Sequence, residues 1–309
     1  MSGSRISSIG IPRAFYYYQY PLLWETYFSA LGIEPVLSPP ASASTVAAAA
    51  PFTEAEHCLA HKIFDGQLVD LASRAQALFI PRILSMTRRH ICCAKFGALP
   101  DASRALLKGP GLGCPAGPLV LSPEINENKR PLFKTLRDFA LELGADKKTA
   151  RNAAGTALET MKRARRTRLE NARALPLQGR FLLLGHPYTV EDPFIARGIR
   201  NKLAEFPLEI MTFEGEDPPA SFIRWCTFNR IYHKLLAMNT ASYRAVIQVS
   251  TFNCGPDSVC ADIFRRLCLD RGLPYLELKV DEHTGFVGIE TRLEAFADSL
   301  EWLPQGEPQ

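Results

Sequence analysis

The sequence predicts an α/β fold in which two Rossmann-like lobes, each with a parallel sheet, are joined by a helical segment. Short apolar runs alternate with longer segments whose apolar residues recur at helical spacing, which is typical of parallel strands connected by helices. The alternation stops at residues 131–175, which lack strand-like runs and are dense in Ala, Leu, Lys and Arg, and it resumes at Gly179. These changes predict four parts: an N-terminal lobe (1–125), a helical connector (126–178), a C-terminal lobe (179–303) and a tail (304–309).

Strands and helices alternate from the start of the N-terminal lobe. Helices are expected at 16–31 and 54–75, where apolar side chains return every three or four residues, and Gly32 stops the first of them. Residues 39–51 are rich in Ala, Ser and Pro and are predicted to form a loop with a helical edge. Strands are expected at the compact apolar runs 6–12, 34–37, 77–83 and 119–121.

The connector and the C-terminal lobe follow the same reasoning. Within the connector, Gly144 and Gly155 predict helix breaks or close contacts between helices. Strands of the C-terminal lobe are expected at 179–185, 208–212, 245–251 and 275–280. Helices are expected between and after them, at 194–206, 222–238, 259–271 and 288–300.

Composition narrows the class of protein. The chain has 309 residues, 47% of them hydrophobic, which is enough for a sizeable core, but no apolar run is long enough to span a membrane. The first residues lack the apolar stretch of a secretory signal, so we expect a cytoplasmic protein whose eight cysteines stay reduced. Metal or redox chemistry is then favoured over a disulfide framework, and the net charge of +4 does not point to nucleic acid.

Three cysteines lie where a strand or a turn is expected to lead into a helix: Cys58, Cys93 and Cys254. Cys254 follows an apolar strand, and ligands of open α/β sheets bind beyond the ends of such strands. Cys58 is expected in the first turn of a helix, where backbone amides and the helix dipole lower the pKa of a thiol. Position alone leaves two interpretations, metal ligands or packing residues, because a buried cysteine is usually a small hydrophobic residue.

The remaining cysteines are interpreted differently. Cys92 is an alternative ligand to its neighbour Cys93, since one metal rarely uses both. Cys114 lies in a glycine-rich loop and is assigned no role. Three cysteines within predicted helices are expected to be packing residues: Cys226, Cys260 and Cys268.

The spacing of the cysteines excludes several kinds of site. No C-x-x-C pair is present, as zinc ribbons and thioredoxin-like proteins require, and no local ferredoxin-like run occurs. Three thiolates gathered only by folding would leave one iron of a 4Fe-4S or larger cluster without a cysteine ligand. Such an open iron favours reactive chemistry over electron storage. A G-x-x-x-x-G-K-[ST] loop is also absent, so no nucleotide site is expected in this chain.

Short motifs spread over nearly the whole chain carry a resemblance to a known family. They are Ile9–Arg13, Glu56–Lys62, Phe79–Arg82, Cys93–Phe96, Leu99–Asp101, Gly185–Tyr188, Cys254–Ser258 and Asp281–Gly285. Together they resemble the 2-hydroxyacyl-CoA dehydratases and the acyl-CoA dehydratase activase-related proteins, of which this chain looks like a short stand-alone member. The family's Cys-Leu-Pro-Val-Lys is here Cys58-Leu59-Ala60-His61-Lys62, and its Cys-Pro-Lys-Phe begins at Cys93, so the thiols are kept and two prolines are lost.

The resemblance implies paired Rossmann-like lobes and an iron–sulfur cluster held by Cys58, Cys93 and Cys254. Related proteins of anaerobic metabolism receive low-potential electrons from an ATP-dependent activase of the actin-like kinase superfamily. They use these electrons for difficult reductions or dehydrations. The activase would be a separate chain, and a homodimer is a further way to complete a three-thiolate site.

Four other residues are candidates for roles near a cluster. His186 follows a strand and could relay a proton or hydrogen-bond a cluster sulfur, or it could be a turn histidine. Glu282 and His283 close the last strand and form either an acid/base pair or a cap of the next segment. Lys62 could place a positive charge near the cluster.

Three functions are compatible with these observations. The first is an iron–sulfur dehydratase or reductase component, a lyase or oxidoreductase, that takes electrons from the activase to act on a small or CoA-linked substrate. The second is a non-catalytic accessory or cluster carrier that docks the activase. The third is a metal-free α/β binding protein whose thiols are structural.

Overall fold

The computed structural model describes residues 6–109, 118–176, 178–204, 206–211, 217–284 and 286–302. Cys114 and the predicted tail at 304–309 lie outside these residues. The strands are β1 (Ser8–Ile11), β2 (Glu34–Leu37), β3 (Ala77–Phe79), β4 (Arg82–Ser85), β5 (Leu119–Leu121), β6 (Glu124–Asn126), β7 (Arg180–Leu184), β8 (Leu208–Ile210), β9 (Tyr243–Thr251) and β10 (Tyr275–Val280).

Helices connect these strands and cover both lobes. They are α1 (Tyr16–Gln19), α2 (Leu23–Ala30), α3 (Ala43–Ala49), α4 (Leu59–Ala72), α5 (Ala94–Lys108), α6 (Leu132–Glu142), α7 (Lys147–Arg173), α8 (Pro187–Val190), α9 (Pro193–Lys202), α10 (Cys226–Ala237), α11 (Gly255–Leu269) and α12 (Phe286–Trp302), with a 3₁₀ turn at Thr240–Ser242. Among the described residues, none of these helices combines the length and apolar character that crossing a membrane requires.

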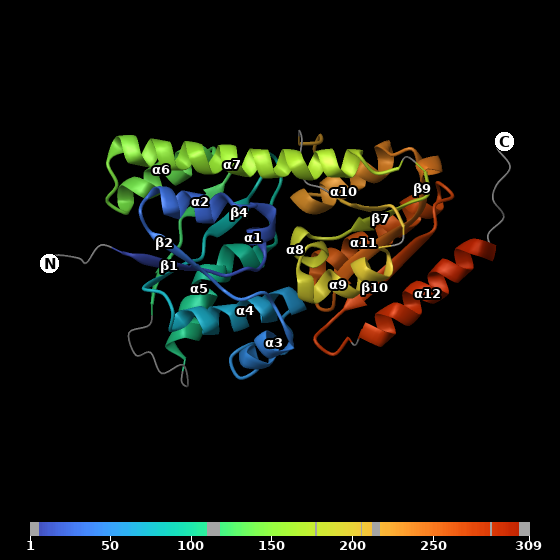
Figure 1. Cartoon of the computed structure of the whole chain (residues 1–309), viewed down its shortest axis with the longest axis horizontal. Helices are drawn as coiled ribbons and strands as arrows, with labels where there is room; N and C mark the ends of the chain where they lie inside the picture. The colour runs from blue at the N-terminus through green and yellow to red at the C-terminus, as the bar shows by residue number, and fades with distance from the viewer. Residues whose placement is uncertain are drawn as a thin grey trace.

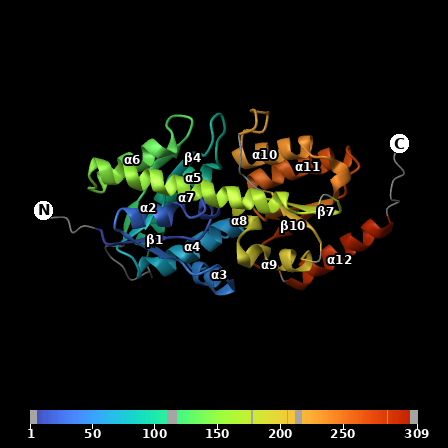
Figure 2. The same cartoon turned by 45° about the horizontal axis from the view of Figure 1, so that its top comes forward.

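The predicted α/β fold with two parallel-sheet lobes is confirmed. In the described part of the chain, the N-terminal sheet has the order β2-β1-β3-β5 and the C-terminal sheet the order β10-β9-β7-β8, with every pairing parallel. A small ladder of β4 and β6 accompanies the first sheet. The lobes lie side by side, and the long α7 packs on α2 and α6 and reaches the C-terminal lobe (Figures 1 and 2). The exact residue boundaries of the four predicted parts stay predictions.

Two elements that were expected to be continuous are interrupted by proline. The strand predicted at 77–83 is two strands, β3 and β4, because Pro81 has no N–H to give to the ladder and β4 turns away to pair with β6. The helix predicted at 16–31 is α1 and α2, separated at Pro21 and at Leu22, whose φ is 59°. Both single-element predictions are therefore wrong.

Local signals explain the segment that was predicted to be mainly loop. Residues Ala43–Ala49 form α3, which starts with a capping box in which Ser42 and Thr45 satisfy each other's backbone N–H groups. In the connector, Gly144 has φ +88° and ends α6, as predicted. Gly155 lies inside α7, and among described residues no atom comes within 4 Å of an added Cβ, so neither a break nor a close contact forms there.

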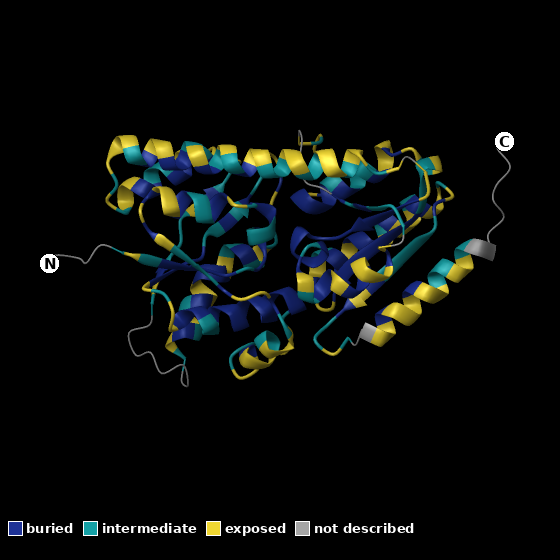
Figure 3. Cartoon of the chain, in the orientation of Figure 1, coloured by how far each residue is buried: buried dark blue, intermediate teal, exposed yellow. Residues whose placement is uncertain are grey.

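The join between the lobes is built from both backbone and side-chain contacts. Ile91, between β4 and α5, donates its N–H to the Arg224 carbonyl oxygen (3.0 Å), and Cys226 donates its N–H to the Ile91 carbonyl oxygen (3.2 Å). The Tyr18 hydroxyl donates to Asp192 Oδ2 at 2.7 Å. Buried apolar residues form one cluster that runs from the first lobe into the second, so the lobes share a core (Figure 3). Two of the predicted ligand cysteines, Cys58 and Cys254, belong to this shared core.

Two glycines on helices provide a test of this packing. Gly66 of α4 faces α3 so closely that an added Cβ would lie 2.0 Å from the Thr45 carbonyl oxygen. We expect Gly66→Ala to lower the free energy of unfolding by about 1–3 kcal/mol, because α3 must move away. Gly155→Ala in the open face of α7 should instead raise it by about 0.5–1 kcal/mol, since alanine favours helix. Urea unfolding of both variants measures the difference, and a neutral Gly66→Ala would contradict the packing of α3 on α4.

Candidate metal centre

Each of the three predicted ligand cysteines is the residue immediately before a helix, as expected. Cys58 precedes α4, Cys93 precedes α5 and Cys254 precedes α11. Cys58 and Cys254 are buried, with 7% and 8% of their surface exposed, whereas Cys93 is half-buried. Two of these helices belong to the N-terminal lobe and one to the C-terminal lobe, so only folding of the whole chain brings the thiols together.

Electrostatic interactions place the three thiols in one neighbourhood. Burial raises the pKa of the Cys58 thiol, and the charge of Cys93 raises it further. Burial and the charge of Asp257 raise the pKa of the Cys254 thiol, with a further contribution from Cys58. Such mutual effects fall off with distance, so they require the groups to be close. The three thiols therefore act on one another electrostatically, but within the described residues their sulfurs do not form a group within 4.8 Å, whereas Cys254 forms one with His186 and Asp257.

Tyr188 of α8 stands among these thiols. Burial raises the pKa of its phenol, followed by contributions from the charges of Cys254 and Cys58, and then from Asp257 and Cys93. Its ring packs edge-on against Phe15 at 5.4 Å between centroids and lies 6.3 Å from that of Phe96. Tyr188 thus packs within a group of buried aromatic rings.

The expected lowering of the Cys58 pKa by the helix terminus does not occur. Burial outweighs the favourable influences, which include the positive charge of Lys95 on α5. In the metal-free protein the thiol is therefore the favoured form. A bound metal ion reverses this preference, because it holds the thiolate.

Cys92 lies in different surroundings from Cys93. Its thiol interacts with that of Cys226, the first residue of α10, and this hydrogen bond together with burial raises the pKa of Cys92. Tyr16 is a further partner of Cys92. The described cysteines are all free thiols. Of the two adjacent candidates, Cys93 therefore acts electrostatically on Cys58 and Tyr188, whereas Cys92 forms a hydrogen bond with Cys226.

His186 lies next to Cys254 and is fully enclosed. It follows β7 and precedes α8, and its ring stacks on Tyr188 with centroids 4.6 Å apart. Burial lowers the pKa of His186 to about 3, so the imidazole is neutral. Its buried Nε2 has no hydrogen-bond partner within the described ranges. One ring nitrogen, the Cys254 sulfur and an Asp257 oxygen all lie within 4.8 Å of one another.

Asp257 belongs to this site, which sequence reasoning missed. It lies in the first turn of α11, and its Oδ2 accepts the N–H of Thr251 at 3.1 Å, at the end of β9. Its Oδ1 is buried and finds no partner among the residues that the structure describes. Burial raises the Asp257 pKa to about 7, so the group can hold a proton at neutral pH. The Cys-Gly-Pro-Asp order at a strand end was the available signal.

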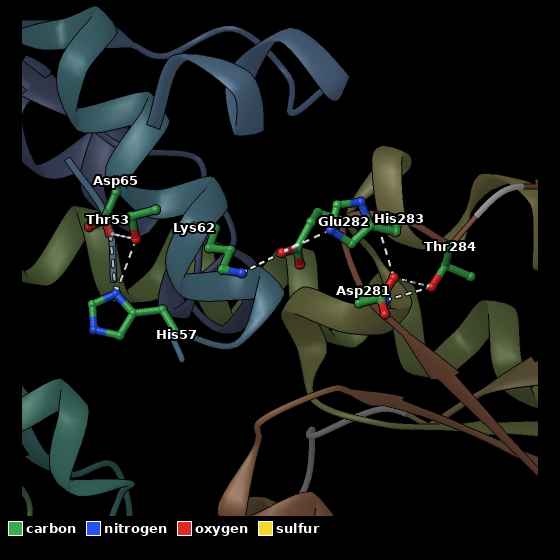
Figure 4. Close-up of polar contacts among 8 residues, drawn as sticks. All are labelled: Thr53, His57, Lys62, Asp65, Asp281, Glu282, His283 and Thr284. Carbon is green, nitrogen blue, oxygen red and sulfur yellow. Dashed lines mark hydrogen bonds and ion pairs between the residues drawn. The ribbon is translucent and has the colours of Figure 1, made fainter. Parts of the chain in front are cut away.

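Lys62 and Glu282 pair with each other, and His283 lies at the surface. Lys62 forms an ion pair with Glu282 across the lobes rather than approaching the thiols (Figure 4). Burial acts to raise the pKa of Glu282, but the Lys62 hydrogen bond and charge outweigh it and lower the value. The His283 side chain is 87% exposed, and its backbone N–H donates to Asp281 at 2.8 Å. The lysine whose charge acts on Cys58 is Lys95, and the acid/base role of Glu282 and His283 stays a prediction.

Comparison with known proteins gives one informative match. A family model described as "CoA enzyme activase uncharacterised domain (DUF2229)" matches residues 8–215, a region that contains Cys58, Cys93 and His186 and ends before Cys254. No curated protein matches the chain.

Similarities to solved structures are weak. ZnuA is similar at 12% identity and a TM-score of 0.31, over 96% of this chain and 98% of that chain. A ZnuA deletion mutant with zinc bound gives 12% identity and a TM-score of 0.28, over 98% and 100% of the two chains. A Zn(II)-bound mutant variant of AdcAII of Streptococcus pneumoniae gives 13% and 0.27, over 95% and 99%. Similarity at this level carries no argument about fold, metal or function.

Proposed function

The chain belongs to the CoA enzyme activase uncharacterised domain family, and from this premise we propose that it is an iron–sulfur protein of the activase and 2-hydroxyacyl-CoA dehydratase system. The family supports the expected relation to activase-related proteins. The observation that supports the finer proposal is that the charges of Cys254, Cys58 and Cys93 all raise the pKa of the buried Tyr188 phenol, after burial itself. In this proposal the three thiolates hold a 4Fe-4S or larger cluster.

The residues present fit such a group. Thiolates are the ligands that iron–sulfur clusters use, and here they come from three separate helix starts. The buried Nε2 of His186 and Oδ1 of Asp257 need partners that the described residues do not supply. The Lys95 charge acts on Cys58 and would offset part of the negative charge of the thiolates. Buried polar atoms without partners and closely placed thiolates lower the stability of a metal-free protein, whereas beside a cluster they can bind it or form hydrogen bonds to it.

A bound cluster would supply low-potential one-electron chemistry at an iron without a cysteine ligand. The chain's own residues would control its surroundings. Neutral His186 offers a nitrogen beside Cys254, and Asp257, with its pKa near 7, can hold or release a proton there. The buried rings of Phe15, Phe96 and Tyr188 would strengthen electrostatic interactions beside them by lowering the local dielectric constant.

Electrons would enter near Cys93. It is the most exposed of the three proposed ligands, and Ile91 just before it is 44% exposed. We place the docking site of the ATP-dependent activase, of the actin-like kinase superfamily, on this side of the join. A cytoplasmic location and a homodimer remain predictions of the sequence.

An anaerobic reduction experiment tests this function. Cluster-loaded protein is mixed with an activase and a chemical reductant, and the visible absorption of the cluster is followed before and after MgATP is added. We expect absorption to fall only when activase and MgATP are both present. If the cluster were reduced at the same rate without the activase or without MgATP, the proposal that an ATP-dependent activase is the electron donor would be contradicted.

A second candidate, an accessory electron carrier, is favoured by the burial of the sulfurs. Cys58 and Cys254 are only 7% and 8% exposed, which suits electron transfer better than direct contact with a substrate. Addition of a 2-hydroxyacyl-CoA to the same reduced mixture separates the two. Turnover that requires this protein assigns the catalytic function, and reduction without turnover assigns the carrier.

A further inference from the structure

A second set of metal-ligating side chains lies on the face of α4 away from the C-terminal lobe. His57, His61 and Asp65 follow one another at four-residue intervals, with the last two inside the helix. Because an α-helix has 3.6 residues per turn, groups four residues apart lie above one another on one face. Figure 4 shows His57, Thr53 and Asp65 gathered there, while Lys62 leaves the helix toward Glu282.

The three side chains meet at distances that suit one small cation. His57 Nδ1 lies 3.5 Å from Asp65 Oδ2, and His61 Nε2 lies 3.7 Å from Asp65 Oδ1. The two imidazole rings are stacked with centroids 3.8 Å apart and planes 5° apart. A tetrahedral ion with bonds of about 2.0–2.2 Å has ligand atoms about 3.3–3.6 Å apart. The two nitrogen–oxygen distances lie within a few tenths of an ångström of this range, but the stacked rings point their nitrogens along parallel planes, so one imidazole has to turn about its Cβ–Cγ bond before both can face one ion.

His61 and Asp65 are buried, and the Asp65 carboxyl group already accepts a hydrogen bond from a neighbouring side chain. His61 and Asp65 are each 4% exposed, and the Thr53 hydroxyl donates to Asp65 Oδ2 at 2.6 Å. Metal-bound carboxylates are commonly held by such an outer hydrogen bond. One charge opposes a cation, since the Lys95 ammonium acts on all three groups.

We propose that His57, His61 and Asp65 bind one divalent transition-metal ion of the Zn²⁺ type, separate from the three-thiol site. Two imidazole nitrogens and one carboxylate oxygen are a donor set typical of zinc, and water would complete the tetrahedron. The ion would fasten the segment that enters α4 to the second turn of the helix. Because His57 is the neighbour of Cys58, this bond would also fix the position of the first proposed thiolate.

A cobalt titration tests the proposal without interference from the thiols. In the full-length chain with Cys58, Cys93 and Cys254 replaced by serine, Co²⁺ binding is followed by visible spectroscopy and calorimetry. We expect one ion per chain, with the weak bands of nitrogen and oxygen ligation and no sulfur-to-cobalt charge-transfer band. His61→Ala and Asp65→Asn should each weaken binding by at least about tenfold. If His57, His61 and Asp65 only form hydrogen bonds with their neighbours, the titration would show no bound Co²⁺.

Controls make the result specific to this site. His283→Ala removes an exposed histidine elsewhere and should leave binding unchanged. Lys95→Gln should tighten Co²⁺ binding, because it removes the opposing charge. If His57, His61 and Asp65 have only a structural role, no variant will change the Co²⁺ titration. If His61→Ala does not fold, His57→Ala gives the same test, since that side chain is 23% exposed. Absence of Co²⁺ binding, or binding that survives the His61 and Asp65 changes, would overturn the proposal.

Discussion

Replacement of Cys254 by serine is expected to remove most of the iron from protein purified without oxygen. Serine keeps the size of the side chain but lacks the soft thiolate that iron–sulfur clusters require. The loss should be at least about tenfold, the scale on which even outer partners of a metal alter affinity. Iron and acid-labile sulfide per chain give the measurement, and the same result is expected for Cys58→Ser and Cys93→Ser.

Two other cysteines provide matched controls. Cys260 lies on α11, the helix that Cys254 begins, and is fully buried, so Cys260→Ser imposes a similar cost of burial without touching the proposed ligand set. Cys92→Ser decides between the adjacent candidates. Both controls should keep the iron. Iron lost with Cys92→Ser and kept with Cys93→Ser would show that the ligand is Cys92, and iron kept with Cys254→Ser would refute the set.

Glu209→Gln is expected to cause the largest loss of stability outside the metal centre. The buried carboxylate on β8 accepts hydrogen bonds from Arg180 (3.0 Å), Lys234 (2.6 Å) and the Tyr243 hydroxyl (2.8 Å). It thereby ties β8 to the first residues of β7 and β9 and to α10. Without the charge, the buried Arg180 loses its ion-pair partner among the described residues and keeps its hydrogen bonds to the carbonyl oxygens of Leu175 and Pro176. We expect a loss of about 3 kcal/mol, the lower end for breaking a buried pair, because Lys234 stays partly solvated.

The pH dependence of this effect has a definite sign. Burial acts to raise the pKa of Glu209, but the Lys234 hydrogen bond and charge and the two other donors outweigh it, so the folded value lies below the ordinary 4.5. A depressed carboxyl pKa contributes stability above the unfolded value, and that stability is lost as pH falls through the folded value. The gap between the wild type and Glu209→Gln should therefore be full at pH 7 and shrink below about pH 4.

Urea unfolding at pH 7 and pH 3 checks both statements. Glu159→Gln is the matched control, since Glu159 pairs with Lys162 on the surface of α7, where both side chains are largely exposed. Surface pairs of this kind contribute less than about 1 kcal/mol, so this variant should be nearly neutral. An equal loss for both variants, or a gap that widens in acid, would contradict the role assigned to Glu209.

Local patterns predicted the fold well because each lobe repeats one simple unit. The limits of β2, β5 and β10 agree with the predicted runs, since each is a short apolar segment between turn residues. The strand predicted at 77–83 and the helix predicted at 16–31 are each divided near a single proline inside an apolar stretch. A prediction from apolar periodicity alone does not detect such a break. The helix α5 was not predicted as an element, and it carries Pro100 in its interior.

The positions of the three cysteines before helices were predicted from the sequence, whereas the surroundings of these cysteines were not. A cysteine before a helix can be recognised locally, and all three have that position. Which lysine acts on them depends on tertiary structure: Lys62 and Lys95 both stand near a cysteine in sequence, but Lys62 turns to Glu282. Likewise, the separation of Cys92 from Cys93 depends on the partner Cys226, more than a hundred residues away.

The most direct test is the iron and acid-labile sulfide content of the unaltered protein, purified and reconstituted without oxygen. A 4Fe-4S cluster held by the three proposed ligands predicts about four iron and four sulfide per chain, together with a broad visible absorption. A protein that retains no more iron or sulfide than its triple serine variant at positions 58, 93 and 254 would contradict the account.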